Sequence, residues 1–353
     1  MTSASVLIAH AAMKYIAPSW LPGGDLQTIW PALVSARSLA QTQPTAYRRV
    51  RWTTPDDDFV DVDFAHDNEE ATQDTQKKSL KRPKRPLLVL FHGLEGSSSS
   101  HYALAFAEVA RQYGWAYAVP HFRGCSGEIN RAPRAYHSGD FEEIGWMLAQ
   151  LRAAHEQAGG GPLLAVGISL GGNALLRWAQ EAGDTASRLV SAVASVCSPL
   201  DLAASGYAIG QGFNRWVYTR MFLNTMKPKA LACLALNPGL FDGQALLASQ
   251  DLYAFDNVFT APLHGFKNTE DYWLRASAKP HMQRIKLPTL ALNAINDPFI
   301  PAHSLPHASE VGRNVTLWHT AHGGHVGYPQ GRFPANVRAM PEAVTAWLAE
   351  HLR

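Results

Sequence analysis

Short apolar runs alternate with longer amphipathic segments through the middle of the chain. The runs are hydrophobic throughout, as in strands buried on both faces: 87–91 (LLVLF), 116–120 (AYAVP), 163–167 (LLAVG) and 192–196 (AVASV). The amphipathic segments between them predict helices over 102–113, 141–154 and 172–182. This alternation predicts an α/β fold, with a mostly parallel central sheet, right-handed crossovers and helices on both faces.

The pattern changes at both ends of this region. Upstream, residues 47–54 and 59–65 alternate with period two, which predicts an antiparallel hairpin at the sheet edge, and the polar stretch 66–86 predicts a solvated loop. Residues 203–280 are rich in aromatics, Met and Pro and contain no clear buried strand, and strands return at 289–294 and 315–320 before a terminal helix.

We therefore expect three parts. Residues 1–202 form the first part of the core, with an N-terminal extension over 1–45. Residues 203–280 form a helical lid inserted into the core, and residues 281–353 complete it.

Composition excludes several classes of protein. Of the 353 residues, 46% are hydrophobic and 17% are charged, so the chain can bury a large core. A net charge of +2 gives no reason to expect a nucleic-acid partner. Three scattered cysteines argue against a disulfide framework.

No basic leader precedes an apolar stretch and no run reaches the roughly 18 apolar residues of a membrane span, so we expect a cytoplasmic protein. The basic run Lys77 to Arg85 favours a solvated loop over a lipid contact.

The strongest chemical signal is Gly167-Ile168-Ser169-Leu170-Gly171, which matches G-x-S-x-G. A buried strand precedes it and a helix follows, as a nucleophilic serine on a tight strand-to-helix turn requires. The glycines leave room for that turn, and the N-terminus of the helix offers free N–H groups to a developing oxyanion. Ser169 is the predicted nucleophile.

A serine nucleophile needs a histidine base and an acid that orients the histidine. In α/β folds that carry a nucleophilic serine on such a strand-to-helix turn, the chain order of the triad is Ser, acid, His. Asp297 follows the strand 289–294 and His325 lies on a glycine-rich loop after the strand 315–320, so both are predicted members of the triad. Asp201 is the competing acid, although it could equally cap the first helix of the insertion.

The neighbouring histidines leave further alternatives. His319 is expected within the last strand, and His322 could be structural. The spacing of His322 and His325 resembles a pair of metal ligands, but no Asp, Glu or Cys cluster lies nearby, so no metal and no cofactor is expected.

The second oxyanion donor is expected in the loop after the strand 87–91. Its turn His92-Gly93-Leu94-Glu95-Gly96 can aim the Leu94 N–H at the acyl oxygen, beside the N–H of Leu170. Arg123, in the loop after the strand 116–120, could hold a loop carboxylate. Cys125 has no histidine placed to activate it.

The chain resembles one branch of this fold, the YheT-type α/β-hydrolases related to the ABHD group. The stretches that carry the resemblance are PSWLPGGDLQTIWP, FHGLEGSSSSHYA, FRGCSGE, YHSGD, GISLGGNALLRW, FDNVFTAPLHGF and GGHVGY. They run in order from Pro18 to Tyr328. Asp25 stands where the family pattern has a histidine, and no role is carried over to it.

The resemblance implies hydrolysis of acyl esters, with Ser169, Asp297 and His325 in the triad and with substrate choice made by the lid. We thus predict a serine carboxylesterase that acts on short- to medium-chain acyl esters through an acyl-enzyme. Two alternatives stay open: an acyltransferase or acylglycerol lipase with the same triad, and a non-catalytic ligand-binding module on this scaffold. No H-x-x-x-x-D acyltransferase signature occurs at any histidine.

Overall fold

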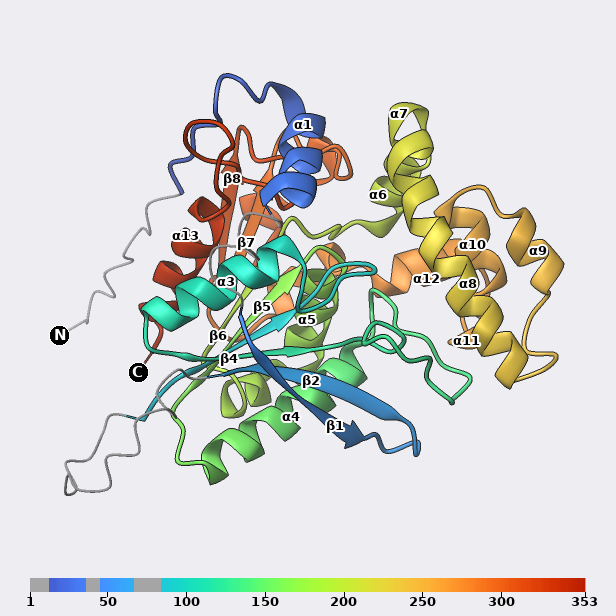
Figure 1. Ribbon diagram of the computed structural model, residues 1–353, viewed down its shortest axis with the longest axis horizontal. Coiled ribbons are helices and arrows are strands. Elements are labelled where there is room, and N and C mark those ends of the chain that lie inside the picture. The colour runs from blue at the N-terminus through green and yellow to red at the C-terminus, as the bar shows by residue number, and fades with distance from the viewer. Residues whose placement is uncertain (1–12, 36–44, 67–83, 353) are drawn as a thin grey trace.

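The computed structural model describes residues 13–35, 45–66 and 84–352. They contain one eight-stranded sheet with strand order β1-β2-β4-β3-β5-β6-β7-β8 (Figure 1). The strands are β1 Tyr47–Thr53, β2 Phe59–Ala65, β3 Leu87–Phe91, β4 Ala116–Pro120, β5 Leu163–Ile168, β6 Ala192–Val196, β7 Thr289–Ala294 and β8 Val315–Thr320. β1 and β2 pair antiparallel at one edge, β2 joins β4 antiparallel, and the remaining pairs are parallel. The predicted fold class is confirmed.

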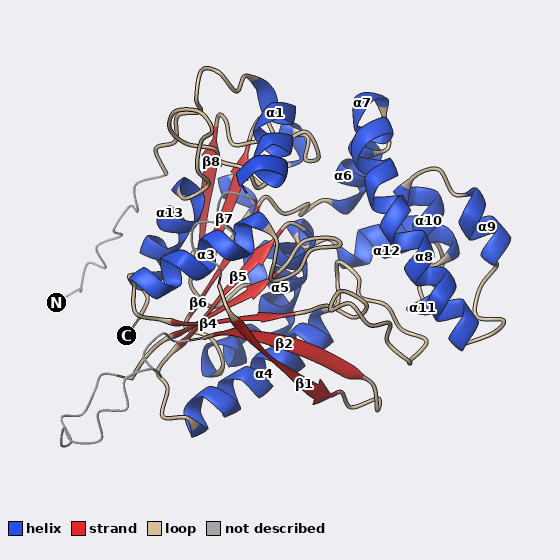
Figure 2. Cartoon of the chain, in the orientation of Figure 1, coloured by secondary structure: helices blue, strands red, loops and turns tan. Residues whose placement is uncertain are grey.

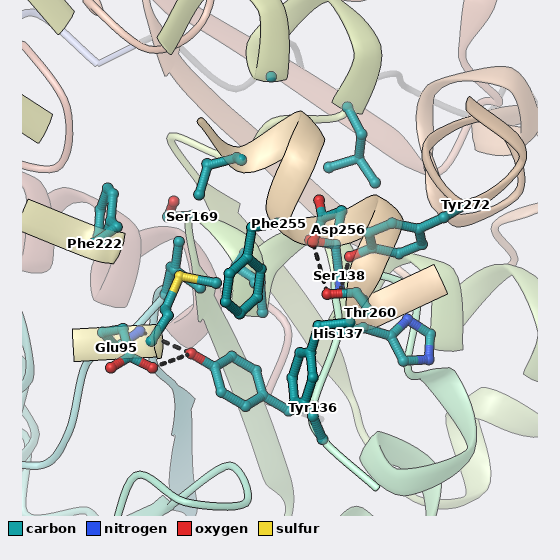
Figure 3. A pocket seen from close by; sticks show the side chains of 18 of the residues that line it. Glu95, Tyr136, His137, Ser138, Ser169, Phe222, Phe255, Asp256, Thr260 and Tyr272 are labelled. Atoms are coloured by element: carbon teal, nitrogen blue, oxygen red, sulfur yellow. Dashed lines mark hydrogen bonds between the residues drawn. The ribbon is translucent and has the colours of Figure 1, made fainter. Parts of the chain in front are cut away.

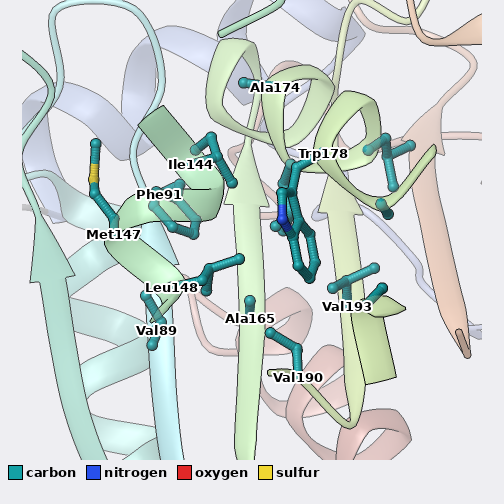
Figure 4. Packing of buried hydrophobic residues seen from close by; sticks show 14 of the residues in the cluster. Val89, Phe91, Ile144, Met147, Leu148, Ala165, Ala174, Trp178, Val190 and Val193 are labelled. Atoms are coloured by element: carbon teal, nitrogen blue, oxygen red, sulfur yellow. The ribbon is translucent and has the colours of Figure 1, made fainter. Parts of the chain in front are cut away.

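Helices cover both faces of this sheet (Figure 2). The core helices are α3 His101–Gln112, α4 Phe141–Gln157, α5 Leu170–Ala182 and α13 Ala339–Ala349. Successive strand residues point to opposite faces, so Leu88 and Leu90 pack in one cluster with α3 and α13, whereas Val89 and Phe91 pack in another with α4 and α5. Figure 4 shows the second cluster, where strand residues such as Val193 meet the α4 and α5 side chains.

A helical insertion joins β6 to β7 and lies to the right of the sheet in Figure 1. Its helices are α6 Leu202–Ile209, α7 Gly212–Asn214, α8 Arg220–Leu236, α9 Gly243–Ala248, α10 Leu252–Val258, α11 Thr260–Leu263 and α12 Thr269–Ala276. Polar residues cap several of them: the Asp251 and Asn268 side chains accept hydrogen bonds from the first turns of α10 and α12. The insertion has an apolar centre of its own, which includes Leu223, Leu246 and Phe255.

The N-terminal extension contributes the helix α1 Gly23–Trp30, beside β7 and β8 in Figure 1. Most of the predicted loop 66–86, and the basic run up to residue 83, lies outside the described residues. At its end, Arg85 lies outside any helix or strand and is partly exposed, and its guanidinium donates to the carbonyls of Gly114 at 2.8 Å and Trp115 at 2.7 Å. Among the described residues, no helix combines the length and the apolar character that crossing a bilayer requires.

Candidate active site

Ser169 occupies the turn between β5 and α5 with a strained backbone, φ 52° and ψ −119°. Neighbouring glycines make this turn possible. A Cβ on Gly167 would lie 2.4 Å from the Cα of Gly172, and a Cβ on Gly171 would lie 2.4 Å from the carbonyl oxygen of His92. Because the end of β3 and the first turn of α5 press so closely on the turn, larger residues at these positions would displace the serine.

The structure brings together the three side chains predicted from the sequence. The hydroxyl oxygen of Ser169 lies 2.9 Å from Nε2 of His325, and Nδ1 of His325 lies 2.8 Å from a carboxylate oxygen of Asp297. A carboxylate can only accept, so Nδ1 carries the proton and Nε2 is free to accept from the serine. The other Asp297 oxygen accepts from the N–H of Phe299 at 2.8 Å, which fixes the carboxylate in place.

The competing residues have other partners. Asp201 is the N-cap of α6, and its carboxylate accepts from the N–H of Ala204 at 3.1 Å. His319 lies within β8, and the exposed His322 has Nδ1 3.5 Å from the amide nitrogen of Asn296. Over the described ranges, no group of three His, Cys, Asp or Glu side chains could hold a metal ion.

The loop after β3 lies directly against the serine, because a Cβ on Gly93 would be 3.2 Å from the Cβ of Ser169. Tyr136 fixes the next turn: its hydroxyl accepts from the N–H of Glu95 at 3.0 Å and donates to the Glu95 carboxylate at 2.9 Å. Within the described part of the chain, the N–H groups of Leu94 and Leu170 donate to no other protein group. Both are therefore available to a ligand beside Ser169.

A cavity of about 170 Å³ opens beside Ser169 and His325, between the loops of the sheet and the insertion. The insertion contributes many apolar side chains to its walls, among them Leu202, Ile209, Phe222, Met226, Phe255 and Phe259. Figure 3 shows Phe255 between Ser169 on one side and Asp256 on the other. The Asp256 carboxylate accepts from Thr260 at 2.6 Å and Trp273 at 2.9 Å, and burial raises its pKa to about 6.

The surroundings of Arg123 and Cys125 indicate structural roles for both residues. The guanidinium of Arg123 is buried and binds the carboxylates of Asp56, Asp58 and Glu143, at 2.9, 3.2 and 2.6 Å. Burial raises the pKa of the Cys125 thiol to about 12, which disfavours the thiolate that a nucleophile needs.

The N-terminal helix α1 also helps to build this site, a role that the sequence pattern does not predict. Thr28 of α1 accepts from the backbone N–H of His325 at 2.8 Å, and Gln27 accepts from that of Gly323 at 3.0 Å. His101 also supports the loop, since its Nε2 lies 3.3 Å from the Val326 carbonyl, and burial lowers its pKa to about 4. The motif PSWLPGGDLQTIWP was visible as part of the family resemblance, but no local pattern connects it to the end of β8.

Comparison with known proteins gives the family. The family model described as alpha/beta hydrolase fold matches residues 86–331, and this chain belongs to that family. It is also similar to a protein of Escherichia coli (strain K12) that bears the name "Putative esterase YheT", with 36% identity over 93% of this chain and 90% of that protein. The predicted membership of the YheT-type, ABHD-related branch is thereby confirmed.

A second named relative and a solved structure are also similar to this chain. The chain is 26% identical to Phospholipase ABHD3 of Homo sapiens over 91% of this chain and 75% of that protein. The solved esterase Pf2001 of Pyrococcus furiosus superposes over 97% of this chain and 98% of that chain, with a TM-score of 0.53 and 13% identity, which is a likeness of fold alone. The predicted carboxylic ester hydrolase is confirmed by the family and by the relatives named as esterase and monoacylglycerol lipase.

Proposed function

We propose that the protein is a serine carboxylesterase in which Ser169 forms an acyl-enzyme. The observation that carries the proposal is the continuous hydrogen-bonded path from Ser169 through His325 to Asp297, at 2.9 and 2.8 Å. In this mechanism His325 Nε2 takes the hydroxyl proton as Ser169 Oγ attacks the ester carbon. It then returns the proton to the departing alkoxide. Water, deprotonated by the same nitrogen, releases the acid and restores the serine.

Negative charge that develops on the acyl oxygen needs donors already in position. The N–H groups of Leu94 and Leu170 are the proposed pair, since both lie in turns beside Ser169 and neither has a protein acceptor within the described ranges. The dipole of α5, which begins at Leu170, favours the same charge. Donors fixed before the reaction need no reorganisation as the charge forms, so they lower the barrier.

The proposed substrates are small esters with short to medium acyl chains. An apolar cavity of about 170 Å³ beside the serine favours a hydrocarbon chain over a charged group. Relatives named as a phospholipase and as a monoacylglycerol lipase support esters with apolar acyl groups. The proposal includes a cytoplasmic location and needs no cofactor.

A series of p-nitrophenyl esters from acetate to dodecanoate tests the proposal. We expect kcat/KM to rise with chain length, pass through a maximum among short or medium chains and then fall as the cavity is filled. No turnover of any member, with the protein shown to be folded, would refute carboxylesterase activity. Adding a primary alcohol as acceptor separates the transferase alternative, which would give a new ester in place of the free acid.

The helical insertion is proposed to act as the lid that sets acyl preference. Phe222 lines the cavity from α8 and is only partly buried, so we expect Phe222→Ala to fold and to prefer longer acyl chains. Each methylene that the enlarged cavity buries contributes about 0.8 kcal/mol. Phe213→Ala is the control, because Phe213 lies in α7 of the same insertion and is 55% exposed. The ester series on both variants checks this, and an unchanged optimum in Phe222→Ala would contradict the role.

A pair of variants tests whether Asp297 or Asp201 is the acid of the triad. Asp297→Asn is expected to lower kcat by roughly 10⁴ with little loss of stability, because an amide at this position favours the wrong tautomer of His325. Asp201→Asn should leave kcat nearly unchanged and cost at most about 1 kcal/mol of stability, since Asp201 caps α6. Steady-state kinetics and thermal unfolding of both variants decide it. Severe loss in Asp201→Asn with near-normal activity in Asp297→Asn would reverse the assignment.

A further inference from the structure

The acid and the base of the proposed triad lie on two separate loops beyond the end of the sheet. The pairing of β7 with β8 ends at Ala294 and Thr320, so Asp297 and His325 both come after the last paired residues. Backbone bonding between the two segments stops at the bond from the Ile295 N–H to the Thr320 carbonyl, at 2.8 Å. Beyond it, the Asn296 side chain joins the loops directly by accepting from the Gly324 N–H at 3.0 Å, and contacts with α1 add to this link.

Gln27 of α1 connects these loops. Its side-chain oxygen accepts from the amide nitrogen of Asn296 at 2.9 Å and from the N–H of Gly323 at 3.0 Å, so it takes one hydrogen bond from each loop. Its amide nitrogen donates to the carbonyl of Leu21 at 2.8 Å. Gln27 is 1% exposed, and a buried amide with these partners has little freedom to shift.

Thr28 acts on the histidine itself. Its hydroxyl donates to the carbonyl of Gly24 at 2.7 Å and accepts from the backbone N–H of His325 at 2.8 Å. The hydroxyl thus ties the histidine residue to the first turn of α1. Within the described residues, that threonine is the one acceptor of the His325 N–H.

The backbones of α1 and the loops approach so closely that side chains are excluded between them. A Cβ on Gly24 would lie 1.8 Å from the carbonyl oxygen of Asn296, and a Cβ on Gly327 would lie 1.7 Å from that of Gln27. Two tryptophans extend the contact: Trp20 and Trp30 donate to the carbonyls of Gly331 and Pro334 at 3.3 and 2.8 Å. The helix is therefore seated on both loops at a fixed position.

We propose that Gln27 and Thr28 are positioning residues of the active site, which hold the Asp297 loop and the His325 loop in register for proton transfer. This inference rests on the proposed function. It assigns the N-terminal helix α1, which precedes the sheet in the chain, to the catalytic arrangement. A displacement of about 1 Å at reacting groups can cost on the order of 10²-fold in rate, so loss of this support should be visible in kcat.

Thr28→Val tests the proposal, since valine keeps the shape of threonine and removes the hydroxyl. We expect kcat to fall between about tenfold and a hundredfold with KM little changed, because the proton-transfer geometry is altered while the cavity is not. Thr28→Ser, which restores a hydroxyl, should recover most of the activity. Thr289→Val is the matched control: that buried hydroxyl bonds the Leu287 carbonyl at 3.0 Å at the opposite end of β7, so the variant should keep its kcat.

A double-mutant cycle separates positioning from general stability. If Thr28 acts through His325 and Asp297, then Thr28→Val added to Asp297→Asn should cost much less than it does alone, because the imidazole is already misoriented. Full multiplication of the two losses would overturn the proposal. So would a folded Thr28→Val with unchanged kcat, or a Thr28→Ser as impaired as Thr28→Val. An inactive wild type would instead refute the proposed function.

Discussion

Ser169→Ala is expected to fold normally and to lose ester hydrolysis, with kcat reduced on the order of 10⁴ to 10⁶. Alanine keeps the Cβ that the turn already accommodates at φ 52°, so the substitution removes the hydroxyl without a new steric demand. The bound ester then has no nucleophile, although the cavity and the proposed N–H donors of Leu94 and Leu170 can still bind it. Turnover of the best p-nitrophenyl ester, with thermal unfolding as the control for folding, gives the answer. More than about a tenth of wild-type activity would exclude Ser169 as nucleophile.

His325→Ala is expected to be nearly as damaging as Ser169→Ala. Loss of the imidazole removes the acceptor that lies 2.9 Å from the serine hydroxyl and takes its proton, and at neutral pH the hydroxyl alone is a weak nucleophile. The two residues serve one step, so the double variant should be little worse than either single variant.

His322→Ala is the matched control for His325→Ala, because His322 lies on the same loop, is exposed and contacts Asn296 instead of the serine. It should keep most of its activity. Kinetics of the single and double variants with one ester check this prediction. An inactive His322→Ala beside an active His325→Ala would show that the base had been assigned to the wrong histidine.

The fold could be predicted because its signals are local. Runs such as 87–91 and 192–196 are buried strands over the predicted residues, since a short continuous apolar run between turn residues is typical of a strand buried on both faces. The turn at Ser169 carries its own signal, because tight approach of backbone demands glycine at fixed spacing. The order of Ser169, Asp297 and His325 followed from the topology of the fold.

The support of the site could not be predicted, because it depends on contacts between distant parts of the chain. The hydrogen bond between Thr28 and His325 spans 297 residues, and the one between Gln27 and Asn296 spans 269. No periodicity or motif spacing encodes such a contact. The lining of the cavity was missed for the same reason, since helical spacing in the insertion shows which residues are apolar but not which of them face Ser169.

Labelling with a fluorophosphonate probe, followed by mass spectrometry of the digested protein, tests whether Ser169 is an activated nucleophile. The probe reacts with a serine that a neighbouring base activates, so it reports the chemistry of the site without knowledge of the substrate. We expect one adduct, on the peptide that contains Ser169, formed rapidly by the wild type and lost in His325→Ala. A folded wild type that stays unlabelled, or an adduct on a different serine, would contradict this expectation.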